Sequence, residues 1–481
     1  MKTSFSTQLL LCTAGIMAVV FYAMPAFGQG AEKEQQLQRR VESQQKQLEA
    51  QQKQLDEQRQ LLQELQKQIK SESADAAEEK VKPWAQPAAG TATAQANKKA
   101  EISDADKRDR ESPTGSNVTY FDPTRVVNIP GTETSFGLHG LVEFQIIHDT
   151  DGLNNNRFDT ATIPVNGAPS QTKFSINPTQ IRLSSTTPVQ SGRLNTMISM
   201  DFNGQLDRPE PRLRLAYGEF VSGKWGWGIL GGQAYATMND LRAAPETLDF
   251  AGPAGIWQTR QPLLRFTKAF GGQMLAEVSI ETPENVTYID AVKRTRLPDA
   301  AIAWTWKAGG RYISHLRLSG LLRDLGAEST TGATDSALGW AVAGSTKLGL
   351  PFLGAKDNIK ITLHYGDGYG TQIKGGPAEG AFDTATLTLE IIRTFGTYGG
   401  LQHFWSDKFR SNLVYGYVNS DPPAFLSGDT FDNTSYAAAD LIWNPYKSLD
   451  VGIEYLWGRR ENKDGAAGTS NRFLFSTRFI F

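Results

Sequence analysis

The chain has 481 residues, a formal net charge of −2 and a mean hydropathy of −0.39. Its 46 Gly, 24 Phe, 14 Tyr and 10 Trp suit many short strands and turns better than helices. The one long apolar run lies at the N-terminus, which excludes a helical membrane protein but not a membrane barrel. The nearly balanced charge gives no reason to expect nucleic acid as a partner.

Residues 1–28 are predicted to form a secretory signal peptide. Lys2 precedes an apolar run from 9 to 22, and Ala26 and Gly28 place small residues at a cleavage site. A retained membrane anchor is the alternative interpretation. Cys12, the one cysteine, lies inside the apolar run, so we expect a mature chain without disulfides or thiolate metal sites.

Residues 31–70 are predicted to form a coiled-coil stalk in the periplasm, and residues 71–115 a flexible linker. Apolar residues recur every seventh position from Val41 to Ile69, while the second core position is mostly glutamine. Such a helix would be roughly 55–60 Å long. A solvated single helix or a disordered lead is the alternative. The linker is rich in Ala, Lys, Glu and Pro and has no apolar period.

Residues 116–481 show alternation of period two between clusters of turn residues. In the first such segment Leu138, Val142 and Phe144 share one face, and His139 and Glu143 share the other. A soluble β-sandwich also alternates, but aromatic residues recur at the strand ends, as in the girdles of transmembrane barrels. The terminal Phe481 and the signal peptide agree with this. We therefore predict a barrel in the outer membrane of a Gram-negative bacterium.

The number of strands follows from connections that alternate between short turns and long loops. Segments 384–394 and 397–405 look separate and give a count of about seventeen, which would leave the C-terminus on the wrong side of the membrane. Merging 384–405 into one bulged strand predicts an all-β, antiparallel barrel of about sixteen strands with an open lumen. Long loops are expected near 149–172, 203–211, 236–257, 282–298, 323–336, 366–383, 419–434 and 461–470.

The long segment Ala236–Trp257 follows the fifth predicted strand. In a sixteen-stranded porin a constriction loop folds into the lumen at this place. Its charged side chains would then narrow and charge the pore, whereas an ordinary outer loop would simply leave them in solvent. These side chains are Asp240, Arg242, Glu246 and Asp249.

A second group of candidate site residues is basic and lies on the polar faces of strands. A charge on the lipid face costs ~2–4 kcal/mol at the midplane, so these side chains should point into the lumen. Rings of basic residues in a pore favour anions, although pairing with Asp201, Glu219 or Glu277 could also explain them. The predicted pore-lining residues are Arg182, Arg212, Arg214, Arg265, His315 and Arg317.

Signals for catalysis and for metal binding are weak. The five histidines are scattered without a metal-ligand spacing, and Gly226–Gly231 matches a dinucleotide motif inside a strand with no helix after it. Asp149 and Asp151 resemble the start of a calcium loop, but Gly152 comes too early. We predict no enzymatic activity, no catalytic residues, no metal and no cofactor.

Several long motifs resemble the DcaP-like outer-membrane porins over roughly 135–481. They are PRLRLAYGEF (211–220), GILGGQAYATMNDLRAAPETLDFAGPAG (228–255), RQP (260–262), HFWSDKFRSNLVYGY (403–417) and AADLIWNPYKSLDVGIEYLWGRRENKDG (438–465). The resemblance implies a homotrimeric porin of sixteen strands with an N-terminal coiled coil. It also implies uptake of small anionic solutes, especially dicarboxylates, past pore cations at Arg182, Arg214 and Arg265. The inward loop departs from this pattern, because it carries three acids and one arginine.

The sequence therefore predicts a passive outer-membrane porin for small hydrophilic, anionic solutes such as dicarboxylates. Its expected partners are two further copies of the chain, outer-membrane lipid and a periplasmic or cell-wall contact of the stalk. Two alternatives stay open. One is a structural barrel tethered by its coiled coil, and the other is a general or cation-preferring porin.

Overall fold

The computed structural model describes residues 53, 126–151, 153, 156–205, 208–308 and 313–481. The chain divides into two compact units, 1–98 and 99–481, and the strands described below belong to the second. Apart from Lys53, the predicted signal peptide, stalk and linker lie outside the described residues. Among the described residues there is no helix with the length and apolar character needed to cross a membrane.

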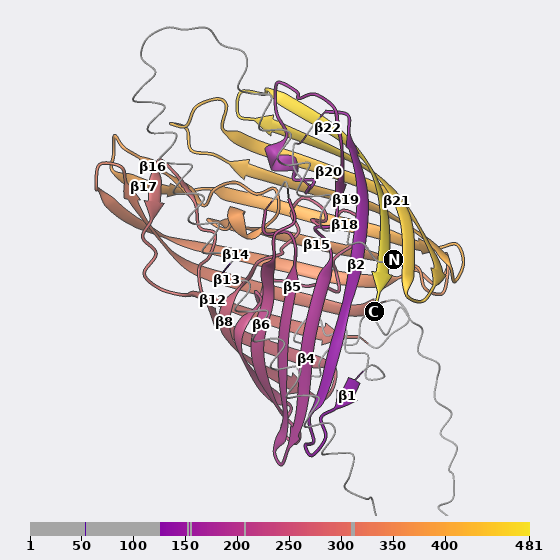
Figure 1. Cartoon of the computed structure of the whole chain (residues 1–481). Helices are drawn as coiled ribbons and strands as arrows, with labels where there is room; N and C mark the ends of the chain where they lie inside the picture. Colours follow the sequence, from indigo (N-terminus) through magenta and orange to yellow (C-terminus); the bar gives the residue numbers. More distant parts are fainter. Residues whose placement is uncertain (1–52, 54–125, 152, 154–155, 206–207, 309–312) are drawn as a thin grey trace, which may run out of the picture. The chain divides into compact units, whose positions relative to one another are not determined.

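Sixteen antiparallel strands form a closed barrel, each paired with the next along the chain (Figure 1). The strands are β2 (Ser135–Asp149), β4 (Gln180–Val189), β5 (Gly192–Asp201), β6 (Arg212–Ser222), β7 (Trp227–Tyr235), β8 (Arg260–Phe270), β9 (Met274–Glu281), β12 (Asp299–Lys307), β13 (Ile313–Ser329), β14 (Thr334–Gly349), β15 (Asn358–Asp367), β18 (Arg393–Phe404), β19 (Phe409–Asp421), β20 (Phe431–Tyr446), β21 (Leu449–Asn462) and β22 (Ala467–Ile480).

The first strand closes the barrel by pairing with both of its neighbours. Val142 of β2 lies opposite Phe479 of β22, and Leu138 lies opposite Leu183 of β4. The backbones of Gly140 and Phe481 exchange two hydrogen bonds of 3.0 Å, so β2 begins at the end of the barrel where the chain ends. This closure confirms the predicted all-β, sixteen-stranded antiparallel barrel.

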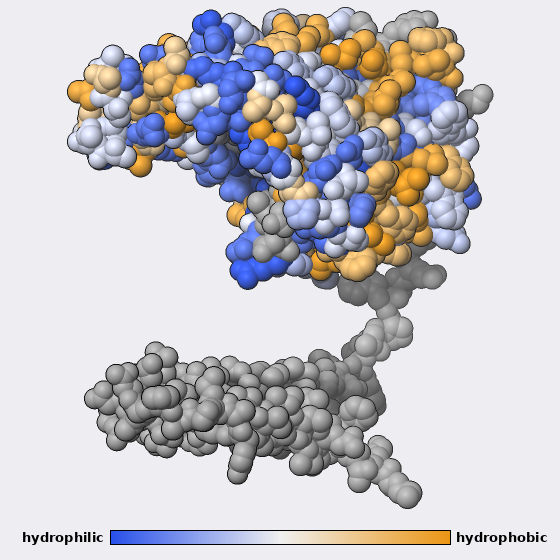
Figure 2. Space-filling view, turned by 90° about the horizontal axis from the view of Figure 1, so that it is seen from above, coloured by the Kyte–Doolittle hydropathy of each residue, from blue (hydrophilic) through white to orange (hydrophobic). Residues whose placement is uncertain are grey.

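The alternation of the sequence explains why these segments are barrel strands. On β12 the side chains of Ile302 and Trp304 point outward and are 59% and 55% exposed, while Ala303 lies inside at 1%. Side chains on a strand point alternately to opposite faces, so one strand supplies an apolar exterior and a more polar lumen. Figure 2 shows patches of hydrophobic residues on the outer surface beside a region where hydrophilic residues gather.

Short elements extend the barrel or pack beside it. β1 (Val126–Asn128) pairs with the start of β2, β3 (Gln171–Ser175) with its end, and β11 (Ala291–Lys293) with the end of β13. The separate sheet of β10 (Tyr288–Ile289), β16 (Gly380–Asp383) and β17 (Thr388–Ile391) packs on a small core with Leu325 and Phe382. The two short 3-10 helices are η1 (Thr160–Thr162) and η2 (Gly370–Gln372).

Three details of the predicted topology differ from the structure. The barrel strand of the 384–405 region begins at Arg393, because Thr388–Ile391 pairs with β16 outside the barrel wall. The expected long loops near 323–336 and 461–470 are short, since the flanking strands continue to within four residues of each other, leaving 330–333 and 463–466. Local alternation does not show which sheet a strand joins, and strand ends beyond the apolar band lose the alternation that would reveal them.

Candidate functional site

The loop between β7 and β8, residues 236–259, folds into the barrel, and we call it the constriction loop. Side chains from distant parts of the wall hold its backbone. Lys360 of β15 donates to the carbonyl of Ala244 at 2.9 Å, and Gln145 of β2 donates to the carbonyl of Leu248 at 3.2 Å. Because neither β15 nor β2 is a neighbour of β7 or β8, the loop crosses the interior of the barrel.

The first acid of the constriction loop, Asp240, is buried against β13 and β14. His315 donates to its carboxylate from Nε2 at 2.7 Å, and Ser345 donates from Oγ at 2.5 Å. Burial alone would raise the pKa of Asp240, but these hydrogen bonds and the charges of His315 and Arg317 outweigh it and lower the pKa to about 2. The carboxylate is therefore ionised and fully engaged at neutral pH.

The other two acids of the constriction loop also have cationic partners. Arg410 of β19 forms two hydrogen bonds with the carboxylate of Glu246, at 2.8 and 2.7 Å, and Gln402 adds a third at 2.7 Å. Lys374 lies 3.2 Å from the carboxylate of Asp249. Two-point pairs of arginine with carboxylate are among the strongest ion pairs in proteins. These two loop acids are thus each paired with a cation outside the loop.

Loop 368–392 also enters the lumen and joins the constriction loop. The backbone of Lys374 bonds with that of Gly255 at 2.8 Å and with that of Ile256 at 3.0 Å. Trp257 stacks on Tyr369 with ring centres 5.4 Å apart and planes inclined by 3°. Both rings are buried in the hydrophobic cluster that fills this side of the lumen. The two loops therefore form one packed body.

Segment 156–170 of the loop after β2 packs inside the barrel against β20, β21 and β22. Arg460 of β21 donates to the carbonyl of Ala161 at 3.1 Å, and the guanidinium carbon of Arg472 lies 5.2 Å from the centre of the Phe158 ring. Phe158 in turn packs edge-on against Tyr436 at 5.9 Å. Side chains from three loops therefore occupy the lumen next to β18–β22.

A group of arginines, which we call the arginine wall, lies on β4, β6 and β8 and in the loop after β2: Arg182, Arg212, Arg214, Arg260 and Arg157. Arg182, Arg214 and Arg260 gather around Tyr235 at the end of β7. Arg214 donates to the Tyr235 hydroxyl at 3.0 Å, and the guanidinium carbon of Arg260 lies 5.5 Å from the centre of its ring. The charge of Arg182 also acts on this hydroxyl. Strands β4, β6, β7 and β8 thus bring Tyr235 and four of these arginines together, and Arg157 comes from the loop after β2.

Positive charge exceeds negative charge at the arginine wall. Asp201 accepts from Arg212 at 3.0 and 2.7 Å and from Arg214 at 2.7 Å, so one carboxylate serves two guanidinium groups. Burial, and next the charge of Arg212, lower the pKa of Arg157 in the adjoining loop. The charges of Asp201, Asp159 and Asp249 act in the opposite direction and raise it.

The remaining predicted site residues lie elsewhere. Arg265 and Arg317 share Glu277 and are 2% and 3% exposed, beneath the base of the constriction loop, where Arg317 also donates to the carbonyl of Thr237 at 2.7 Å. His315 is engaged by Asp240. Arg242 lies on the constriction loop, and its amide donates to Asp240 at 3.2 Å. Of the predicted basic residues, the structure brings together Arg182, Arg212 and Arg214.

Three members of the site were not identified from the sequence. Arg260 opens the RQP motif and lies directly opposite Tyr235 in the pairing of β7 with β8, a register that the sequence does not reveal. Arg157 lies in a loop without periodicity, and no sequence signal points to it. Phe250, at the tip of the constriction loop, lies 5.1 Å from the guanidinium carbon of Arg214. The tip of the constriction loop therefore reaches across to the arginine wall and packs against it.

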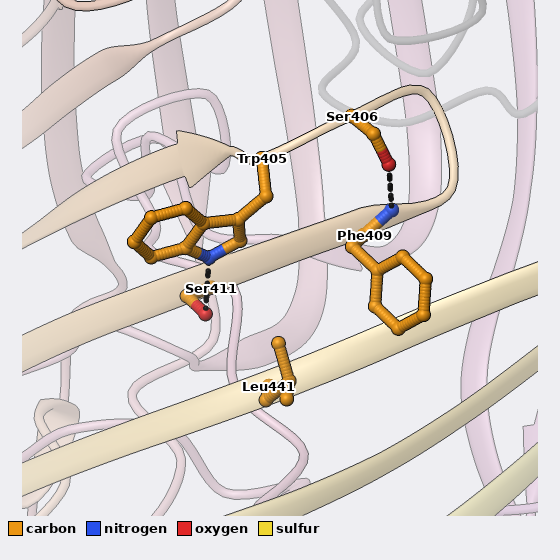
Figure 3. Close-up of a pocket in the computed structure, with 5 residues that line it drawn as sticks. All are labelled: Trp405, Ser406, Phe409, Ser411 and Leu441. Atoms are coloured by element: carbon orange, nitrogen blue, oxygen red, sulfur yellow. Dashed lines mark hydrogen bonds between the residues drawn. The ribbon is translucent and has the colours of Figure 1, made fainter.

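A shallow hollow on the barrel is lined by residues of β19, β20 and the turn that precedes β19 (Figure 3). Trp405 donates from its indole nitrogen to Ser411 at 3.0 Å, and the Phe409 amide donates to Ser406 at 3.2 Å. Trp405, Phe409 and Leu441 are among the exposed large hydrophobic residues of the barrel exterior. This hollow is therefore separate from the lumen and belongs to the membrane-facing surface.

Comparison with known proteins identifies the family. Residues 127–481 match the family model described as DcaP outer membrane protein. The chain belongs to this family. The DcaP outer membrane proteins are outer-membrane channels, so the predicted recognition and outer-membrane localisation are confirmed.

Solved structures are similar to this chain to different degrees, and the first of them shares its fold. The outer membrane channel DcaP of Acinetobacter baumannii has a TM-score of 0.66 at 22% identity, covering 74% of this chain and 100% of that chain. An anion-selective porin from Comamonas acidovorans has a TM-score of 0.48 at 10% identity, covering 73% and 100%. OmpF of Salmonella typhi, in complex with daunomycin, has a TM-score of 0.48 at 11% identity, covering 74% and 100%. A search of curated proteins found no match.

Proposed function

We propose that the protein lets small anionic solutes, including dicarboxylates, diffuse passively across the outer membrane. The observation that carries this proposal is the asymmetry of charge in the lumen. Arginine side chains gather at the arginine wall, while each acid of the constriction loop is held by a partner. Basic groups that line a pore favour anions, and a guanidinium group recognises a carboxylate through two hydrogen bonds.

The three acids of the constriction loop do not favour cations in this arrangement. Two unit charges 4 Å apart attract by about 4 kcal/mol at an effective dielectric constant of 20. Arg410 and Lys374 lie within this distance of Glu246 and Asp249. A passing cation would therefore have to displace one of them to bind either carboxylate. By contrast, Asp201 is shared between two arginines, which leaves guanidinium hydrogen-bonding capacity for a solute.

A solute at the constriction would meet two kinds of surface. Arg214 and its neighbours offer charged donors, and the Phe250 ring, which packs against Arg214, offers an apolar face beside them. A dicarboxylate with a short carbon chain can satisfy both, because its carboxylates bind guanidinium groups while its chain contacts the ring. Neutral sugars and diamines lack the charge that this wall recognises.

Liposome swelling tests this proposal with solutes of matched size. We expect proteoliposomes to swell faster in a dicarboxylate than in a diamine of the same chain length, and Arg214→Gln with Arg260→Gln to reduce the difference. Equal rates for the dicarboxylate and the diamine in the unmodified protein would contradict the proposal. An unrelated neutral sugar below the size limit reports on whether the channel itself is open.

We also propose that the protein is a homotrimer. Its three stalks, residues 31–70, associate with one another in the periplasm and contact a periplasmic component or the cell wall. The heptad of apolar residues supports association of this segment, and its polar core positions favour a coil held in place by another contact. Native mass spectrometry of the purified mature protein should give the mass of three chains. Deleting 31–70 should weaken the trimer, and a monomer before and after deletion would contradict the assignment.

A further inference from the structure

Inward-facing glycines lie where the constriction loop meets the wall. A Cβ atom added to Gly400 of β18 would lie 2.5 Å from Pro245, and one added to Gly416 of β19 would lie 2.4 Å from the carbonyl oxygen of Ala254. A Cβ atom on Gly452 of β21 would lie 2.8 Å from the Leu248 side chain. The wall therefore lacks side chains at three places where the loop rests on it.

Two residues beyond Gly452, Glu454 points to the same side of β21 and binds the backbone of the loop tip. Its carboxylate accepts the amide of Leu248 at 3.1 Å and the amide of Asp249 at 2.6 Å. Arg478 of β22 donates to the carbonyl of Leu248 at 3.2 Å from the neighbouring strand. The peptide groups around Leu248 are thus held from both sides by the wall.

The space beside Gly452 and the hydrogen bonds of Glu454 act on the same short segment of the constriction loop, Leu248 and Asp249. Gly452 allows the Leu248 side chain to lie close to β21, and Glu454 holds the adjacent amides at this depth. The next residues lead to Phe250, whose ring packs on Arg214 at the arginine wall. The loop tip is therefore fixed at both ends, by the contact of Leu248 with β21 and by that of Phe250 with Arg214, and its position between them limits the open part of the lumen.

We propose that Gly452 and Glu454 are positioning residues that set the width of the channel. Gly452 sets the depth at which the loop tip rests, and Glu454 holds it there. This inference goes beyond the proposed anion preference, because it concerns the size of the opening and not its charge. Neither residue belongs to the arginine wall.

The two positions predict different electrical signatures in single-channel recordings. Gly452→Leu pushes Leu248 away from β21 and toward the lumen, because a packed site does not absorb extra volume without a shift. We expect lower open-channel conductance and a smaller size limit in liposome swelling. Glu454→Ala removes the acceptor of two amides, and we expect a mobile loop with brief current interruptions. Glu454→Gln, which keeps one acceptor oxygen, should interrupt the current less often.

A complementary exchange separates positioning from general damage to the fold. Gly452→Leu combined with Leu248→Gly moves the bulky side chain from the loop to the wall, and we expect conductance to return toward the unmodified value. Ile453→Leu, on the membrane-facing side of the same strand at 58% exposure, serves as the matched control and should conduct normally. Heat-modifiable migration on gels verifies that each barrel is folded.

The proposal is overturned if folded Gly452→Leu conducts like the unmodified protein, or if Leu248→Gly fails to restore conductance in the double variant. Should Gly452→Leu fail to fold, Gly452→Ala replaces it, and unchanged conductance in that variant has the same meaning. Current interruptions at the unmodified frequency in Glu454→Ala would also overturn the role of Glu454. The reversal potential in a salt gradient tests anion preference separately, so the two proposals can fail independently.

Discussion

Arg410 of β19 binds the carboxylate of Glu246 through two hydrogen bonds of 2.7 and 2.8 Å, across 164 positions of the sequence. The pair joins the constriction loop to the barrel wall and cancels one negative charge in the lumen. Asp450 accepts a further hydrogen bond from the same guanidinium at 2.8 Å. Arg410 is thus both an anchor of the loop and a counterion for its acid.

Replacing Arg410 should reduce anion preference without touching the arginine wall. Arg410→Gln leaves the Glu246 carboxylate without its cation, so the lumen gains an uncompensated negative charge. We expect the chloride-to-potassium permeability ratio, measured from reversal potentials, to fall. Adding Glu246→Gln to this variant should bring the ratio back up. A folded single variant with an unchanged ratio would show that the Glu246 charge is not sensed by permeating ions.

Arg265, by contrast, should contribute little to selectivity although the sequence placed it in the pore. Its side chain is 3% exposed and lies 3.7 Å from Glu277, which Arg317 also binds. Arg265→Gln therefore removes a buried charge that a solute does not reach. We expect a permeability ratio near that of the unmodified protein. A loss as large as that caused by Arg214→Gln would place Arg265 in the conducting path.

The contrast between Arg265 and Arg214 shows what sequence reasoning could and could not predict. Alternation placed both arginines on the polar face of a strand, because period two is a local property. Whether such an arginine meets a solute or a buried acid depends on pairings between distant segments, such as Glu277 with Arg317. For the same reason the depth of the loop, set by Gly452 and Leu248, has no local signal.

The fold itself was more accessible to prediction than the site. Apolar exteriors and terminal aromatics report on membrane contact and indicated the barrel, while the alternation of short turns and long loops indicated its even number of strands. The error at Thr388–Ile391 arose because alternating polar and apolar residues suit any half-buried strand, including one in the separate sheet with β16. Arg260 was overlooked because its partner Tyr235 is defined by strand register and not by spacing in the chain.

Acid should loosen the base of the constriction loop. The folded pKa of Asp240 is lowered to about 2 from the ordinary value of 3.8. Because this pKa is depressed, ionised Asp240 stabilises the docked loop at pH values above the ordinary pKa. This stabilisation is lost as the pH falls toward the pKa of the folded protein. Between about pH 4 and pH 2 we therefore expect current interruptions to become more frequent. Asp240→Asn, which lacks this titration, should show a smaller change of frequency over this range.

The buried cation Arg323 should be important for the stability of the barrel. It binds Asp299 at 3.0 Å and Glu379 at 3.1 Å, and all three side chains are 0% exposed. Arg323→Met would leave two buried carboxylates without a cation, a kind of change that typically costs about 3–5 kcal/mol in the free energy of unfolding. Urea titration of the protein in detergent measures this loss.

Arg294 provides the matched control for that titration. Its ion pair with Glu328 lies at the surface, where the Arg294 side chain is 62% exposed. Exposed pairs contribute about 0–1 kcal/mol, so Arg294→Met should change the midpoint of urea unfolding little. Equal losses in the two variants would contradict the assigned role of the buried group.

The reversal potential under a potassium chloride gradient tests the central claim most directly. The account predicts anion preference in the unmodified protein, a smaller preference in Arg214→Gln with Arg260→Gln, and a retained or larger one when Asp240, Glu246 and Asp249 are neutralised together. Cation preference that persists after those three acids are neutralised would contradict the claim that the arginine wall selects the solute.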